Sequence, residues 1–167
     1  MELLEYLVNG LKDECPDARF FQNIWLDSKR GKGAKADLIV LHASGLYLIE
    51  LEHQPGRVYG NGKRMNWVLR KDDGTTAFFP NPVVRVKKGA ELLARKCNGT
   101  GDYIQPVVVF SEESLLSQVP KDGDVRICNA DDFPIILHMQ KGGRARVPAE
   151  LRDTFAKQLK MLELLSK

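Results

Sequence analysis

Three acidic residues, Asp37, Glu50 and Glu52, have a spacing that could build a metal site. Asp37 opens one apolar run, and Glu50 and Glu52 close a second apolar run that follows a short turn at 42–45. Side chains two apart on a strand share a face, so Glu50 and Glu52 point the same way. If the two runs pair as a hairpin, Asp37 lies beside them. Three carboxylates at the edge of an otherwise apolar sheet suit a hard divalent cation such as Mg²⁺.

Basic residues lie on both sides of this acidic segment. Residues 28–35 (SKRGKGAK) carry four basic residues and no acidic one, and residues 53–100 carry ten basic residues against three acidic ones. Such stretches favour a polyanion, and nucleic acid brought to a metal site is one interpretation. The other interpretation is a set of solvated faces, and charge alone leaves both open.

The hydrophobic pattern predicts an α/β fold with a mixed central sheet flanked by helices. Apolar residues over 2–14 have helical spacing, and Pro16 stops that helix. Asn81 and Pro82 supply an N-cap and a first-turn residue for a further helix. The run 104–110 (IQPVVVF) is typical of a central strand covered on both faces. The other predicted elements are strands at 19–26, 36–42, 46–52, 57–59, 65–70, 75–79 and 125–128, helices at 82–96, 131–139 and 148–166, and basic loops at 28–35 and 141–146.

Composition favours one globular domain over residues 1–167. The chain is 43% hydrophobic and 28% charged, and no apolar run approaches the ~18 residues of a membrane span. The N-terminal segment lacks the basic start and the small-residue cleavage site of a signal peptide. Cys15, Cys97 and Cys128 are widely spaced and odd in number, which argues against a disulfide framework. We therefore expect a cytoplasmic protein without membrane contact.

In their order and spacing, these motifs resemble the nuclease-related domain, NERD. The resemblance covers roughly residues 19–127. NERD is similar to the PD-(D/E)xK nucleases, so the resemblance implies a restriction-endonuclease-like core, Mg²⁺ or Mn²⁺ as cofactor, and cleavage of nucleic-acid phosphodiesters, with DNA as the expected substrate. The residues that carry it are Asp37, Glu50-x-Glu52, Pro55-Gly56, Trp67 after a Gly/Asn turn, and Asn81-Pro82 before a basic helix.

Two segments, 53–68 and 81–93, look most like NERD domains of NERD–kinase proteins in BREX-type phage-defence systems. This narrower resemblance implies a role in phage defence, with a kinase domain or other defence proteins as partners. The sequence itself has no kinase signature. If the chain comes from such a protein, it is a fragment of it.

The chain departs from the family pattern at Glu52, because NERD domains have Glu-x-Lys where this sequence has Glu-x-Glu. The family's lysine orients the attacking water and offsets negative charge, which a glutamate cannot do. In one interpretation, Glu52 is an extra ligand or a general base. Lys35, two residues before Asp37 and on the same strand face, then supplies the positive charge. In the other interpretation, hydrolysis is lost and only nucleic-acid or metal binding remains.

An active site of this kind assigns a role to each residue of the acidic segment. Asp37, Glu50 and the carbonyl of Leu51 would hold the metal ion, which polarises a phosphate oxygen and lowers the pKa of its bound water. Glu52 would accept the proton or hold a second ion. Lys35 would steady the developing negative charge.

Basic and aromatic residues supply the expected contacts to nucleic acid. Trp67 has two interpretations, because it could stack on a base or belong to the core. Two other classes of function stay open: a nucleic-acid-binding module without catalysis, and an assembly domain that docks a partner through the helix at 148–166. The residues expected to contact nucleic acid are Arg57, Lys63, Arg64, Trp67, Arg85, Lys87 and Lys88.

Overall fold

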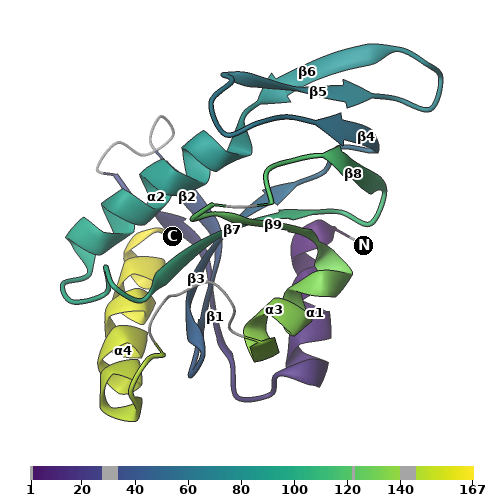
Figure 1. Cartoon of the computed structure of the whole chain (residues 1–167). Coiled ribbons are helices and arrows are strands. Elements are labelled where there is room, and N and C mark those ends of the chain that lie inside the picture. Colours follow the sequence, from purple (N-terminus) through teal and green to yellow (C-terminus); the bar gives the residue numbers. More distant parts are fainter. Residues whose placement is uncertain (1, 28–33, 122, 140–145) are drawn as a thin grey trace.

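The computed structural model describes residues 2–27, 34–121, 123–139 and 146–167. It has a five-stranded sheet with helices on both faces and a four-stranded sheet beside it (Figure 1). This mixed α/β architecture was predicted and is compatible with a nuclease-like core. The helices are α1 (Leu3–Glu14), α2 (Pro82–Lys96), α3 (Phe133–Met139) and α4 (Ala149–Leu165), with a short 3-10 helix η1 (Ala130–Asp132) before α3. The strands are β1 (Arg19–Trp25), β2 (Lys35–His42), β3 (Gly45–Glu52), β4 (Gly56–Tyr59), β5 (Asn66–Arg70), β6 (Thr76–Pro80), β7 (Ile104–Phe110), β8 (Ser114–Gln118) and β9 (Arg126–Asn129).

The large sheet has the order β1-β2-β3-β7-β9. β1, β2 and β3 are antiparallel neighbours, whereas β3, β7 and β9 run parallel, so the sheet is mixed. Alternate residues of β2 enter two different cores. Leu38 and Val40 pack with α1 and α3, and Ile39 and Leu41 pack with α2 and α4. Because both faces are covered, the central strands are apolar almost throughout.

The small sheet has the order β6-β5-β4-β8, and one of its strands was not predicted. Strand β8 has the sequence SLLSQ, which lacks the alternation of a half-buried strand. It forms because it pairs in parallel with β4, with Gly56 opposite Ser114 and Val58 opposite Leu116. The predicted basic loops fall mostly on 28–33 and 140–145, outside the described residues.

Trp67 lies in the core between the two sheets, so the prediction that it contacts nucleic acid is wrong. Its side chain is fully buried, and its ring stacks on Phe110 with 6.3 Å between centroids. Its Nε1 donates to the carbonyl of Asn61 at 2.8 Å. A Cβ at Gly60 would come within 2.1 Å of the indole, so this crossing requires glycine. The tryptophan therefore fixes the small sheet against β7.

Helix α2 begins at a cap that also fixes the loop before β5. The Asn81 side chain accepts from the backbone N–H of Val83 at 2.8 Å and donates to the carbonyls of Asn61 and Arg64 at 3.1 and 2.7 Å. Asn81 is buried, and Pro82 fills the first helical position, as predicted. This cap holds the first turns of α2 over one face of the large sheet (Figure 1). No helix in the described part of the chain is long and apolar enough to cross a membrane.

Candidate active site

The three predicted carboxylates share one face of the large sheet, where β2 begins and β3 ends. Leu38 pairs with Ile49, so the next residues outward, Asp37 and Glu50, come beside each other. Strand alternation then places Glu52 on the same face, which α2 covers. The backbone N–H of Leu51 donates to Asp37 Oδ2 at 3.2 Å and ties the two strands together.

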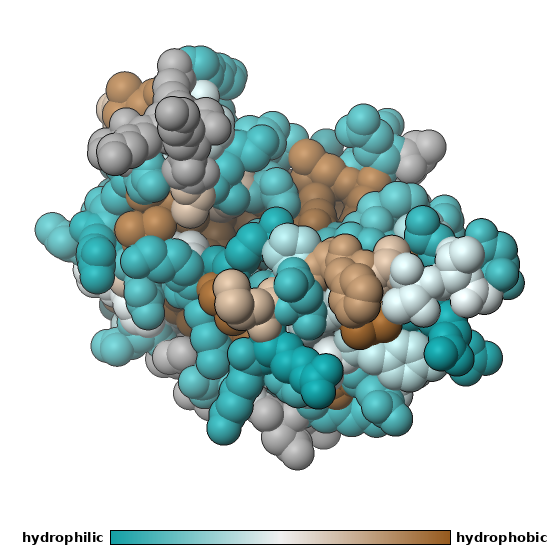
Figure 2. Space-filling view, turned by 90° about the horizontal axis from the view of Figure 1, so that it is seen from above, coloured by the Kyte–Doolittle hydropathy of each residue, from teal (hydrophilic) through white to brown (hydrophobic). Residues whose placement is uncertain are grey.

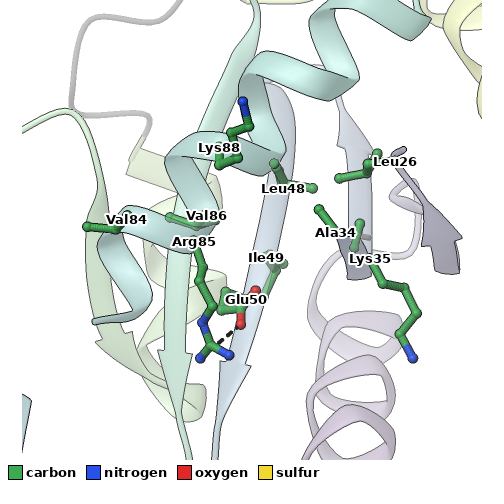
Figure 3. A pocket seen from close by; sticks show the side chains of 12 residues that line it. Leu26, Ala34, Lys35, Leu48, Ile49, Glu50, Val84, Arg85, Val86 and Lys88 are labelled. Carbon is green, nitrogen blue, oxygen red and sulfur yellow. Dashed lines mark ion pairs between the residues drawn. The ribbon is translucent and has the colours of Figure 1, made fainter. Parts of the chain in front are cut away.

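Arg85 of α2 binds both glutamates of the Glu-x-Glu segment. Its Nη2 lies 3.2 Å from Glu50 Oε1 and also contacts Glu52 Oε1. Figure 3 shows the Arg85 side chain reaching from α2 down to Glu50. Glu52 is 5% exposed, and the amide of Gln54 donates to its Oε2 at 3.2 Å. Both glutamates thus contact the same guanidinium nitrogen, and contacts between ionised partners are stronger than those between neutral groups.

Burial makes both glutamates unusually weak acids. The pKa of Glu50 is raised to about 7, mainly because the carboxyl is removed from water; the Arg85 charge opposes this shift, and the nearby charges of Asp37 and Glu52 contribute to it. Burial also raises the pKa of Glu52, against the lowering effects of the Gln54 hydrogen bond and the Arg85 charge. Near neutral pH, Glu50 therefore exchanges a proton readily, and a neighbouring positive charge stabilises its ionised form.

Lys35 lies on the predicted strand face but not against the glutamates. Its Nζ is 5.8 Å from the centre of the Trp25 ring, a cation–π contact. In Figure 3 its side chain runs away from Glu50. The cation that contacts the carboxylates is thus Arg85, and Lys35 lines a cavity of about 470 Å³ beside them. Leu26, Leu48 and Val86 contribute apolar walls to that cavity, and Glu50, Arg85 and Lys88 contribute polar ones.

The donor chemistry of the site suits a divalent cation. Asp37, Glu50 and the carbonyl of Leu51 would offer oxygen ligands only, which Mg²⁺ and Mn²⁺ prefer. Burial raises the pKa of Glu50, so a bound cation would stabilise the ionised form of this carboxyl. Within the described ranges, no group of three or more His, Cys, Asp or Glu side chains is close enough to hold a metal ion. The backbone carbonyl and water would therefore complete the ligand set.

The model of the nuclease-related domain family matches residues 2–111, about two thirds of the chain. The chain belongs to the NERD family. The match begins earlier than the resemblance found from motifs, because it includes α1, and it ends just after β7. No curated protein and no solved structure matches the chain. Membership indicates a nuclease-related function, and with it nucleic acid as the partner.

The NERD match contains all the carboxylates of the site and Arg85. Sequence reasoning assigned Arg85 to phosphate binding and missed its contact with the glutamates. Arg85 and Glu52 are 33 residues apart in the sequence, so local spacing does not predict their contact. The available signal was the position of Arg85, four residues after the helix cap. The Gln54 contact was missed as well, although the alternation Glu50, Glu52, Gln54 on one strand face could have suggested it.

Among the predicted nucleic-acid contacts, those other than Trp67 are exposed. Lys87 and Lys88 lie on α2 close to Arg85 in the sequence, and Lys88 lines the same cavity as Glu50. Lys63 and Arg64 lie in a turn whose backbone N–H groups both bind Asn61 Oδ1 at 2.9 Å. Arg57 lies on β4 of the small sheet, so the predicted contacts come from three different elements.

Proposed function

We propose that this NERD domain is a metal-dependent nuclease that cuts nucleic-acid phosphodiesters. The observation that carries the proposal is the meeting of Asp37, Glu50, Glu52 and Arg85 at one end of the large sheet. Family membership supplies the reaction class. The proposed cofactor is Mg²⁺ or Mn²⁺, held by Asp37, Glu50 and the carbonyl of Leu51. When bound, such an ion polarises a phosphate oxygen and lowers the pKa of a coordinated water.

The residues of the chain supply the proton acceptor and the positive charge. Glu52 is the proposed general base, because burial raises its pKa toward the range in which a carboxylate takes a proton from water. Arg85 replaces the family's lysine. Its guanidinium is half exposed, so it can contact Glu52 and still face a phosphate group. The charge-offsetting role first assigned to Lys35 belongs to Arg85 in this mechanism.

The direct test is cleavage of plasmid and of labelled oligonucleotides in Mg²⁺ or Mn²⁺. Asp37→Asn and Glu50→Gln should each abolish cutting. Glu91→Gln is the matched control, because Glu91 is an exposed carboxylate farther along α2. Cutting that persists in Asp37→Asn at the wild-type rate would exclude this site.

A binding module without catalysis is the second candidate, and the Arg85 contacts favour it. One guanidinium already contacts two glutamates at the place where the family has a lysine. This alternative predicts salt-sensitive binding of nucleic acid without cutting in either metal. Asp37→Asn and Glu50→Gln would then leave binding unchanged.

We also propose a cytoplasmic role in phage defence, next to a kinase domain or other defence proteins. The support is the resemblance of segments 53–68 and 81–93 to NERD–kinase proteins. The test is the plating efficiency of phage on cells that express the chain in its native operon, with Glu50→Gln as comparison. Equal plating on both strains would contradict a defence role for this site.

A further inference from the structure

One face of the small sheet is buried and the other is open. On the buried face, Val58, Trp67 and Leu69 are at most 3% exposed. Their neighbours along β4 and β5 alternate to the opposite face. That open face presents two cross-strand rows: Leu115, Arg57, Arg70 and Thr76 in one, and Gln118, Tyr59, Val68 and Phe78 in the other.

The first row places two arginines directly opposite each other. Arg57 of β4 pairs with Arg70 of β5, and both side chains are exposed. Within residues 2–27, 34–121, 123–139 and 146–167, neither arginine has an ion pair. Like charges in directly opposed positions destabilise a sheet. A bound anion would remove that repulsion, so this row is complementary to phosphate.

The second row carries the aromatic side chains. Phe78 is 70% exposed, which is unusual for a phenylalanine on a sheet. Val68 lies between Phe78 and Tyr59 in this row, and Tyr59 is half-buried. Exposed rings beside arginines match single-stranded nucleic acid, because unpaired bases stack on the rings and the cations follow the backbone. A duplex keeps its base faces stacked and offers nothing to Phe78. Seen from above, the surface of the molecule mixes brown apolar groups with teal polar ones (Figure 2).

We propose that the open face of the β4–β5–β6–β8 sheet binds a single strand of nucleic acid, with bases on Phe78 and Tyr59 and phosphates on Arg57 and Arg70. The proposal rests on the proposed function, and it names the substrate class. The surface lies close to the site along the chain, since β4 begins four residues after Glu52. Gln54 in that short segment contacts Glu52, and Ser114 of β8 donates to the Gln54 carbonyl. The small sheet is therefore joined directly to the segment that carries the carboxylates.

Fluorescence anisotropy with a labelled oligothymidine of about 15 nucleotides tests the proposal, with EDTA present so that nothing is cut. Phe78→Ala should weaken binding by roughly tenfold or more, and Phe78→Trp should retain it. The double variant Arg57→Ala, Arg70→Ala should reduce the slope of log affinity against log salt by about 1.4. A duplex of equal length should compete poorly. Met161→Ala is the control, because Met161 is a comparably exposed apolar residue on α4.

Each outcome decides the proposal. Unchanged affinity in Phe78→Ala, or a duplex that competes as well as the single strand, would overturn it. So would a wild type that binds no oligothymidine but self-associates through Phe78 in sedimentation, which would make this face a protein interface. Phe78 is exposed, so melting curves of its variants should match wild type and exclude misfolding. Binding is measured without metal, so it is separate from cleavage. If binding depends on Phe78 but no nucleic acid is cut, only the proposed nuclease activity is refuted. If nucleic acid is cut but binding does not depend on Phe78, only the proposed binding surface is refuted.

Discussion

The chemistry of the site depends at the residue scale on two buried glutamates that share one arginine. Folding removes the side chains of Glu50 and Glu52 from water and brings both into contact with Arg85. Removal of one partner from such an arrangement leaves the others without compensation. Substitutions here are therefore expected to change the proton affinities of the glutamates that remain.

The raised pKa of Glu50 predicts that stability falls as pH rises from about 4.5 to about 7. In this range the native protein keeps a proton on Glu50 that the unfolded chain has released, so the native state is favoured at the acidic end. The raised pKa of Glu52 acts in the same direction. Glu50→Gln stays neutral, so its loss of stability over this range should be smaller than that of wild type by about 1–3 kcal/mol.

Urea unfolding of both proteins near pH 5 and near pH 8 measures this difference. Glu91→Gln serves again as the control and should follow wild type. A wild type that becomes more stable over this range, while Glu50→Gln does not, would show that Glu50 is not protonated in the native state.

Arg85→Ala should lower the cleavage rate by about a hundredfold, because it removes the cation that the Glu-x-Glu segment lacks. Arg85→Lys should recover part of the rate, since it keeps the charge and loses the fork. Arg95→Ala, which removes an exposed arginine in the last turn of the same helix, is the control. Single-turnover rates at saturating substrate measure the effect, and a wild-type rate in Arg85→Ala would remove Arg85 from the mechanism.

At the element scale, the site depends on how α2, β3 and the small sheet meet. The alternation of β3 was readable from sequence, and it placed Glu50 and Glu52 on one face as predicted. The contact from α2 was not readable, because it depends on where the Asn81 cap holds the helix. Strand β8 was missed for the same reason: its pairing with β4 comes from the tertiary fold and not from its own pattern.

Gly56 tests the junction between the site and the small sheet. Its φ of +133° favours glycine, and a Cβ there would meet the Arg70 carbonyl oxygen at 2.5 Å. Gly56→Ala should therefore destabilise the protein by about 1–3 kcal/mol and weaken single-strand binding through Arg70. Gly62→Ala, where a Cβ meets nothing within 4 Å, should change neither. Urea unfolding and anisotropy measure the two effects, and a Gly56→Ala protein as stable as Gly62→Ala would contradict this packing.

At the scale of the whole molecule, one apolar core joins both sheets. Val58 and Trp67 of the small sheet pack in the same cluster as Ile39 of the large sheet and Phe155 of α4. We therefore propose that the chain folds as one unit, although the NERD match ends at residue 111. The sequence predicted the class and most elements, because their periodicity is local. It left two interpretations of Trp67 open, since composition does not say whether a tryptophan in a short strand faces the core or the solvent, and the core interpretation is correct.

Calorimetric titration of Mn²⁺ into wild type, Asp37→Asn and Glu91→Gln at about pH 8 tests the central claim most directly, because Glu50 is then largely ionised. We predict saturable binding in wild type and in Glu91→Gln, weaker binding in wild type at about pH 6, where protons compete for Glu50, and none in Asp37→Asn. Absence of binding in wild type, or equal binding in Asp37→Asn, would contradict a metal site at this end of the sheet.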